Sequence, residues 1–243
     1  TDYSLHPVNY KETKSSSFSE NISAQSAILV DIKSNNVLYA KNENKHMYPA
    51  STTKLMTALT VLQIMNVNDV VTIGDEITFI ASDSSKAGFS RGQVVTVKEL
   101  LQGLLISSGN DAAYVLAKAA GQEIFEDNIA NEGKTFTSQQ CVQRFVLEMN
   151  RNVRDMELEN THFTSPDGYD DDDQYTTATD LSKIAIEAYS NSVIADICGK
   201  SSAYSDTLSK TWTSTNALLN KNGSFYYEYC QGLKTGSTGL AGK

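Results

Sequence analysis

Runs of apolar residues mark short strands toward both ends of the chain. Residues 27–32 and 37–40 are apolar stretches on either side of a polar turn at residues 33–36, and this arrangement predicts a β-hairpin. Residues 70–73 predict one more short strand. Residues 232–235 predict another close to the C-terminus.

Apolar positions with helical spacing fill the middle of the chain. Between residues 53 and 65 they recur at intervals of three and four, so we predict a buried helix with Ser51 in its first turn. Thr96 is followed three residues later by Glu99, the pattern of a capping box, and the apolar run behind it predicts a helix that ends near residues 107–109. Further helices are predicted at residues 111–120, 139–156 and 179–190.

This order of elements predicts an α+β fold. An antiparallel sheet assembled from both ends of the chain would be flanked by helices, with an all-helical lobe inserted between its halves. Residues 1–22 are polar and predict a loose N-terminal arm, which leaves residues 23–243 as one domain. A chain of 243 residues is long enough for that domain to bury a stable core without disulfides or metal ions.

Composition excludes several classes of function. The formal net charge is -9, so neither nucleic acid nor an anionic membrane surface is expected as a main partner. The four aspartates at residues 170–173 lack the spacing of a calcium loop and predict a solvated loop. No apolar run could span a bilayer and no signal peptide is visible, so we expect a cytosolic protein or the mature part of an exported one.

The cysteines and histidines form no metal-binding pattern. Cys141, Cys198 and Cys230 are far apart and odd in number, which excludes a disulfide framework and leaves one bridge at most. The three histidines are equally scattered, so we expect no metal site and no cofactor.

Ser51 and Lys54 form the single Ser-x-x-Lys sequence of the chain. Positions three apart share one face of a helix, so the lysine amine is within reach of the serine hydroxyl. A serine hydroxyl is a poor nucleophile unless a base takes its proton, and lysine is such a base once burial and a nearby cation lower its pKa. The same motif also arises by chance, as a helix start with a solvated lysine.

Two further motifs carry suitable side chains. Ser108-Gly109-Asn110 lies between two predicted helices, where it would supply a proton-relay hydroxyl and a substrate-binding amide, although an ordinary helix break has the same composition. Lys234-Thr235-Gly236 follows the predicted C-terminal strand. There a cation and a hydroxyl can grip a carboxylate, and the glycine lets a ligand lie against the backbone. Each motif alone is weak evidence.

Together and in this order, the three motifs resemble the signature of penicillin-binding proteins and serine β-lactamases. The surrounding sequence is similar to the low-molecular-mass D-alanyl-D-alanine carboxypeptidases, the peptidase S11 family with a β-lactamase/transpeptidase-like fold. The resemblance extends from about residue 23 to the end of the chain and is carried by residues 49–58, 107–113, 160–168, 175–181, 212–219 and 232–238.

The resemblance implies three catalytic residues. Ser51 would attack the carbonyl of the penultimate D-Ala of a peptidoglycan stem peptide, and Lys54 would act as its base. Ser108 would pass a proton to the leaving D-Ala. Water would then hydrolyse the acyl-enzyme, and β-lactams would acylate the same serine as covalent inhibitors.

The resemblance also implies a set of binding residues. Asn110 would hold the peptide amide, while Lys234 and Thr235 would bind the terminal carboxylate beside Gly236. The backbone N–H groups of the nucleophile and of Ser237 would form the oxyanion hole. The implied location is the bacterial cell envelope outside the cytoplasm, with membrane association only through segments absent from this chain.

Two departures from the family pattern affect these expectations. The family's chain continues past Lys-Thr-Gly with further strands and a C-terminal helix, whereas this sequence stops at Lys243. We therefore expect the strand that carries Lys234 to lack a neighbour and to become an exposed edge. Ser237 stands where some relatives carry a histidine.

Three other functions stay open at this level. A serine β-lactamase would need a glutamate in a Glu-x-x-Leu-Asn context for fast deacylation, and residues 157–160 lack that pattern. A non-catalytic peptidoglycan-binding or β-lactam-sensing module would bind stem peptide without releasing D-Ala. Transpeptidation to an amine acceptor is compatible with the same motifs.

Overall fold

The computed structural model describes residues 3–11 and 22–242, and within these ranges helices and short strands are joined by long loops. The α-helices are α1 (Lys54–Ile64), α2 (Val97–Leu105), α3 (Asn110–Glu126), α4 (Ser138–Asp155), α5 (Ala178–Ser190) and α6 (Ser192–Cys198). The strands are β1 (Ala27–Asp31), β2 (Asn36–Lys41), β3 (Val70–Thr72), β4 (Val94–Thr96), β5 (Ser202–Ser205) and β6 (Lys210–Thr213). The short 3-10 helices are η1 (Ala50–Thr53), η2 (Glu76–Thr78), η3 (Ile129–Asn131) and η4 (Ala217–Leu219). The predicted α+β class is confirmed.

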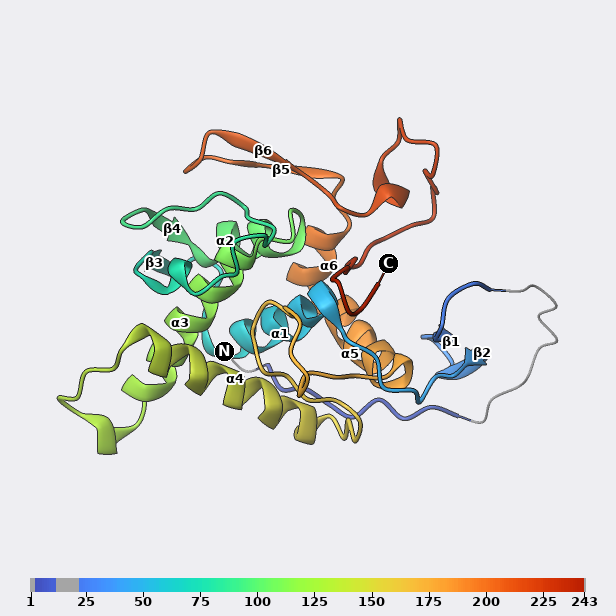
Figure 1. Ribbon diagram of the computed structural model, residues 1–243, viewed down its shortest axis with the longest axis horizontal. Helices are drawn as coiled ribbons and strands as arrows, with labels where there is room; N and C mark the ends of the chain where they lie inside the picture. The colour runs from blue at the N-terminus through green and yellow to red at the C-terminus, as the bar shows by residue number, and fades with distance from the viewer. Residues whose placement is uncertain (1–2, 12–21, 243) are drawn as a thin grey trace.

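In the described residues the strands form three antiparallel pairs, β1–β2, β3–β4 and β5–β6 (Figure 1). The predicted hairpin is confirmed as β1–β2, with Ala27 opposite Lys41 and Asp31 opposite Asn36. The sequence does not predict β4, β5 or β6, because strands of three or four residues are too short to show a period.

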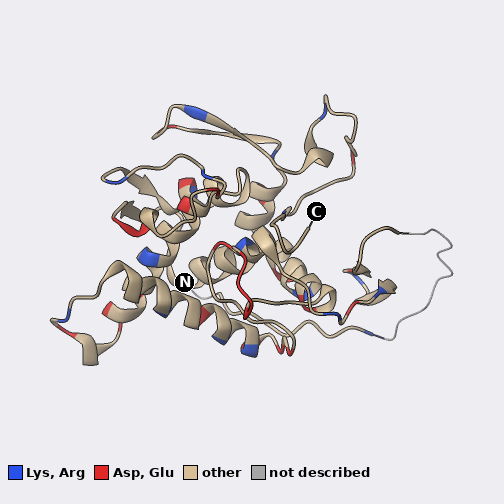
Figure 2. Cartoon of the chain, in the orientation of Figure 1, with Lys and Arg blue, Asp and Glu red and all other residues tan. Residues whose placement is uncertain are grey.

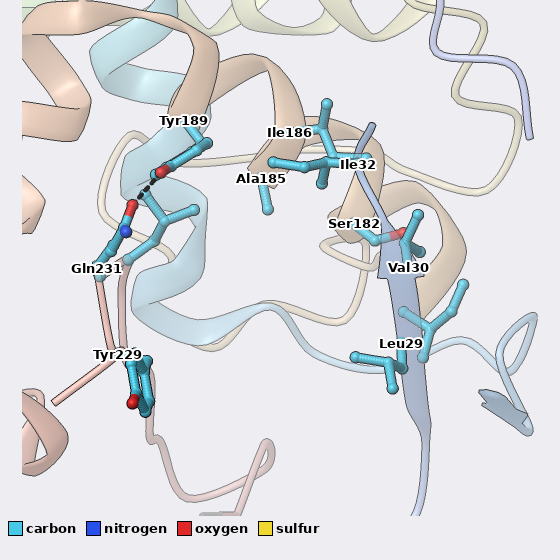
Figure 3. A pocket seen from close by; sticks show the side chains of 12 residues that line it. Leu29, Val30, Ile32, Ser182, Ala185, Ile186, Tyr189, Tyr229 and Gln231 are labelled. Carbon is cyan, nitrogen blue, oxygen red and sulfur yellow. Dashed lines mark hydrogen bonds between the residues drawn. The ribbon is translucent and has the colours of Figure 1, made fainter. Parts of the chain in front are cut away.

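The strand predicted at residues 232–235 is not formed. These residues have no paired strand beside them in the described part of the chain. A largely apolar cavity of about 720 Å³, lined in part by Leu233, lies beside them, with Leu29 of β1 on one side, Gln231 on the other and the α5 residues Ala185 and Ile186 along its wall (Figure 3). A strand persists only where a neighbour satisfies its N–H and C=O groups, and here β1 is not hydrogen-bonded to this segment.

Helix α1 lies inside the hydrophobic core (Figure 1). Its residues from Lys54 to Leu62 are all buried, and it packs against α2, α3, α4 and α5. Apart from Lys54 the helix carries no charged side chain, which suits an element that is covered on every face. The fold therefore buries the Lys54 amine in an apolar interior.

The inserted helical lobe consists of α2, α3 and α4. The capping box predicted at the start of α2 is only half formed. At α2 the Thr96 hydroxyl accepts the backbone N–H of Glu99 at 3.2 Å, as predicted. The Glu99 carboxylate does not return to the helix start, because it accepts the hydroxyl of Thr207 at 2.7 Å and that of Ser205. Half of the capping box is thus replaced by a link from α2 to the β5–β6 turn.

The N-terminal residues 3–11 contact the body of the protein. Leu5 is buried, the Tyr3 hydroxyl donates to Glu187 at 2.9 Å, and the Tyr10 hydroxyl lies 2.6 Å from that of Ser182. Both partners belong to α5. The expectation of a loose arm is therefore wrong for residues 3–11, since tyrosine rings and hydroxyls fix them; residues 1–2 and 12–21 of the predicted arm lie outside the described residues.

Candidate active site

Ser51 and Lys54 meet where η1 passes into α1. Ser51 belongs to η1 and Lys54 is the first residue of α1, so the two side chains project from the same side of consecutive turns. The Lys54 Nζ donates to the Ser51 Oγ at 2.9 Å and to the main-chain oxygen of Asp167 at 2.6 Å. The contact predicted from the Ser-x-x-Lys spacing is present.

Burial changes the chemistry of the Lys54 amine. The side chain is 0% exposed, and this desolvation lowers the pKa of Lys54 to about 7. The carboxylate of Asp167 opposes the shift, the charge of Lys234 adds to it, and Asp111 opposes it. Near pH 7 a large fraction of the amine is neutral and can accept a proton from Ser51.

The Ser108-Gly109-Asn110 motif lies on the turn between α2 and α3. Asn110 is 6% exposed, and its Nδ2 donates to the Asp167 carboxylate at 2.7 Å. Ser108 is buried with φ 61°, and Ala50, directly before the nucleophile, has φ 49°. Residues with a Cβ are strained in this left-handed region by about 1–3 kcal/mol each, and such strain concentrates at functional sites.

Asp111 fixes the loop at residues 81–92 beside this turn. Its carboxylate is 1% exposed and accepts the N–H of Ala112 at 3.0 Å and three backbone N–H groups of the loop, from Ala87 at 2.8 Å, Gly88 at 2.8 Å and Phe89 at 3.0 Å. Three donors converging on one carboxylate make this loop a rigid wall of the site.

The Lys-Thr-Gly segment, residues 234–236, lies against the nucleophile. The side chains of Lys234 and Thr235 form hydrogen bonds with neighbouring protein groups. A Cβ at Gly236 would lie 3.1 Å from the backbone nitrogen of Ser51, so this glycine permits the close approach. Lys234 Nζ donates to the main-chain oxygen of Thr235 at 2.7 Å, and the Thr235 hydroxyl lies 2.6 Å from that of Thr215. Desolvation lowers the pKa of Lys234 to about 8.

A cavity of about 160 Å³ opens beside the nucleophile. It is lined by Ser51, Asp83, Ser84, Ser85, Asn110, Asp167, Gly168, Tyr169, Asp170, Ser237, Thr238 and Gly239. The Tyr169 hydroxyl donates to Asp83 at 3.0 Å and joins two of its walls. Of the predicted site residues, Ser51, Asn110 and Ser237 reach this cavity and Lys54 bonds to Ser51 behind it. The others, Ser108, Lys234, Thr235 and Gly236, do not line it.

Asp167 and Gly168 are site residues that the sequence pattern assigned only to a turn. Asp167 touches both Lys54 and Asn110. Gly168 has φ +83°, and a Cβ there would come within 1.9 Å of the main-chain oxygen of Ala50, so only glycine fits. The sequence indicates these two residues only through the Pro-Asp-Gly turn, which lies within residues 160–168, one of the segments that resemble the family.

The acidic run at residues 170–173 follows this turn on the loop that leads to α5 (Figure 2). Asp171, Asp172 and Asp173 are exposed, as expected of a solvated loop. Across residues 3–11 and 22–242, no group of three or more His, Cys, Asp and Glu side chains could hold a metal ion. Over the same ranges, no helix has the length and apolar character needed to cross a membrane.

Solved structures with this fold include two DD-peptidases. The Streptomyces K15 DD-transpeptidase matches with a TM-score of 0.80 and 32% identity, over 92% of this chain and 83% of that one. The D-alanyl-D-alanine carboxypeptidase of Mycobacterium tuberculosis H37Rv matches with a TM-score of 0.74 and 28% identity, over 98% of this chain and 79% of that one. The fold is therefore that of the DD-transpeptidases, a β-lactamase-like α+β fold.

The family follows from the sequence match. Residues 11–129 and 139–243 match the D-alanyl-D-alanine carboxypeptidase family, peptidase S11, and the chain belongs to it. The carboxypeptidase DacF of Bacillus subtilis is 30% identical over 226 residues, which are 90% of this chain and 52% of DacF. DacA of Escherichia coli K12 is 32% identical over 234 residues, 91% of this chain and 51% of DacA. The chain thus spans about half the length of these relatives, and the predicted family is confirmed.

Proposed function

We propose that this chain is a serine-type D-alanyl-D-alanine carboxypeptidase that removes the terminal D-Ala from peptidoglycan stem pentapeptides. The observation that supports this most strongly is the fully buried Lys54 amine, 2.9 Å from the Ser51 Oγ. The neutral amine takes the Ser51 proton while the oxygen attacks the carbonyl of the penultimate D-Ala.

The attack leaves negative charge on the former carbonyl oxygen. Ser51 and Ser237 line the same cavity, and their backbone N–H groups are our candidates for the oxyanion hole. Each such donor contributes roughly 3 kcal/mol to the transition state. Ser108 passes a proton to the departing nitrogen, the C–N bond breaks, and D-Ala leaves an ester on Ser51 that water hydrolyses.

Binding of the substrate falls to groups around the cavity. Asn110, which lines the cavity, holds the stem-peptide amide. Lys234 and Thr235 do not line the cavity but precede Gly236, which packs on the Ser51 backbone, and they are our candidates for binding the terminal carboxylate. The cavity of about 160 Å³ is small, so only the D-Ala-D-Ala end of a stem peptide enters it. A β-lactam presents a carboxylate and a reactive carbonyl at the same spacing and acylates Ser51 too.

The substrate also defines a location. Stem peptides ending in D-Ala-D-Ala belong to the cell-wall polymer, so the proposed activity is exercised outside the cytoplasm, in the bacterial cell envelope.

Transpeptidation is the second candidate activity. The Streptomyces K15 protein is named a D-alanyl-D-alanine carboxypeptidase among similar sequences and a DD-transpeptidase among similar structures. The acyl-enzyme is common to both outcomes, and the acceptor decides between them. Addition of a glycine or D-amino-acid acceptor during turnover, with the products resolved by mass, distinguishes water from an amine as acceptor.

Replacement of Ser51 tests the nucleophile. The chain is expected to release D-Ala from a diacetyl-Lys-D-Ala-D-Ala peptide and to form a penicilloyl adduct visible by intact mass. Ser51→Ala should abolish both, because it removes the attacking oxygen. Ser190→Ala, which changes an exposed serine at the end of α5, is the matched control and should retain both.

The other outcomes of this assay point to other functions. Labelling that survives Ser51→Ala would remove Ser51 as the nucleophile. An adduct without any D-Ala release would identify a β-lactam-sensing module. An adduct that disappears rapidly would identify a β-lactamase.

Replacement of Lys54 tests the base. Lys54→Ala is expected to slow acylation of Ser51 by about 10²- to 10⁴-fold, the range of general-base catalysis. Stopped-flow measurement with a chromogenic β-lactam gives this rate. A loss of less than about fivefold would assign the base to another group.

A further inference from the structure

Asp167 lies between the two halves of the site. It is 1% exposed, and its carboxylate Oδ2 accepts the Nδ2 of Asn110 at 2.7 Å. Its main-chain oxygen accepts the Nζ of Lys54 at 2.6 Å. One residue thus contacts the base through its backbone and the substrate-binding amide through its side chain.

The position of Asp167 is itself fixed by its own turn. The second carboxylate oxygen, Oδ1, accepts the hydroxyl of Ser165 at 2.8 Å and the backbone N–H of Tyr169 at 3.1 Å. The next residue, Gly168, packs directly on the backbone of η1 at Ala50. Both oxygens are therefore occupied, and the turn cannot shift without moving the nucleophile segment.

We propose that Asp167 is a positioning residue for the reaction: its carboxylate orients the Asn110 amide, and its main-chain oxygen holds the Lys54 amine against Ser51. This inference rests on the proposed function of the site. It assigns a task to a residue outside the three motifs.

The first consequence concerns the direction in which Asn110 faces. A carboxylate only accepts hydrogen bonds, so it holds the NH₂ group of the amide and rules out the flipped orientation. The Asn110 Oδ1 and the second N–H are then left for a ligand in the cavity. Without Asp167 the amide would rotate, and a ligand N–H would meet the wrong group in part of the population.

The second consequence concerns the charge of Lys54. Burial and the charge of Lys234 favour its neutral form, whereas the carboxylates of Asp167 and Asp111 favour the ammonium. Asp167 is the larger of the two opposing carboxylate effects. It therefore keeps the amine protonated to a higher pH and sets the pH at which the base becomes available.

Two substitutions separate these consequences. Asp167→Asn removes the charge but keeps an acceptor oxygen for Asn110, whereas Asp167→Ala removes both. Asp180→Asn is the matched control, because Asp180 is also a buried carboxylate (3% exposed) that accepts Asn160 N–H at 2.8 Å, outside the site. Circular dichroism confirms that each variant is folded.

The charge is read directly by NMR titration of the chain labelled with ¹³Cε-lysine, which needs no turnover. Lys54 should titrate far below the exposed lysines, and Asp167→Asn should move its pKa lower still, because a negative charge has been removed. Asp180→Asn should leave this pKa in place. An unchanged Lys54 pKa in Asp167→Asn would overturn the proposal.

The orientation of Asn110 is read from its side-chain amide and from acylation. In Asp167→Ala the Asn110 amide protons should exchange with solvent faster, and acylation by penicillin at alkaline pH should fall about 10- to 100-fold. Asp167→Asn should stay within about threefold of the wild type. In an Asn110→Ala background, Asp167→Ala should cost less than about twofold, because its partner is already absent.

These readouts separate the two proposals. Fully additive losses from Asn110→Ala and Asp167→Ala would show that Asp167 does not act through Asn110 and would overturn the inference, with the carboxypeptidase activity intact. A wild-type chain that releases no D-Ala would instead defeat the proposed function. The lysine titration and the amide exchange would still decide the role of Asp167 in that case.

Discussion

At the scale of single residues, the site depends on two lysines with opposite requirements. Lys54 must be neutral to act as a base, and burial lowers its pKa to about 7. Lys234 must be charged to hold a carboxylate, and burial lowers its pKa to about 8. The interval in which both conditions hold is narrow, and the charge of Lys234 adds to the lowering of the Lys54 pKa.

A bell-shaped pH dependence of acylation follows. Below about pH 7 Lys54 is protonated, so the rate should rise as the pH increases through about 7. Above about pH 8 Lys234 loses its charge, so the rate with a carboxylate-bearing penicillin should fall. Lys234→Arg keeps a cation at all these pH values and should remove the alkaline limb. A flat profile between pH 6 and 9 would contradict both assignments.

At the scale of elements, carboxylates join parts of the chain that are far apart in sequence. Glu99 on α2 holds the β5–β6 turn through the hydroxyl of Thr207. Asp111 on α3 holds three successive N–H groups of the loop at residues 81–92. That loop supplies Asp83, Ser84 and Ser85 to the cavity wall. The shape of the cavity is therefore set by α3 as much as by the loop.

Removal of the Asp111 carboxylate should release the loop. Asp111→Ala leaves four backbone donors without this acceptor, three of them on buried residues, and is expected to lower the free energy of unfolding by about 2–4 kcal/mol. Urea denaturation measures this loss. Asp155→Asn at the exposed end of α4, where a 3.7 Å ion pair is broken, should change stability by less than about 0.5 kcal/mol. Equal effects of the two substitutions would show that the loop is held by other contacts.

At the scale of the whole molecule, one hydrophobic core connects the helices with the β5–β6 pair. Trp212 on β6 is 2% exposed and belongs to the same cluster as the residues of α1 and α3. Its Nε1 donates to the main-chain oxygen of Ala87 at 2.9 Å, and its ring lies 5.6 Å from that of Phe89. The hairpin is thus tied to the loop that forms the cavity wall.

This connection predicts a single unfolding transition. Trp212 is the one tryptophan in the sequence, so its fluorescence reports on β6 while far-ultraviolet circular dichroism reports on the helices. The two signals should give the same urea midpoint, because a shared core unfolds cooperatively. Trp212→Phe identifies the part of the fluorescence signal that comes from this residue. An earlier fluorescence midpoint would show that the β5–β6 pair separates before the helices melt.

The sequence alone determined several helices, one hairpin and the reactive pair, because the periodicity and spacing of residues show which side chains share one face of an element. The β1–β2 hairpin, the helix carrying Lys54 and the helices at residues 138–155 and 178–190 follow from such patterns. The contact between Ser51 and Lys54 follows from a spacing of three residues. Three short motifs, in their order along the chain, are enough to indicate the family.

Only the tertiary structure decided how distant residues meet. Lys54 and Asp167 are 113 positions apart, and their hydrogen bond depends on a turn packing against η1. The same packing buries the amine and lowers its pKa, which no local pattern reports. The strand expected at residues 232–235 was wrong for the same reason, since a strand needs a neighbour as well as a suitable sequence. The spacing of three residues identified Ser51 and Lys54 as the reactive pair. Long-range packing lowered the pKa of Lys54 and brought Asp167 into contact with it.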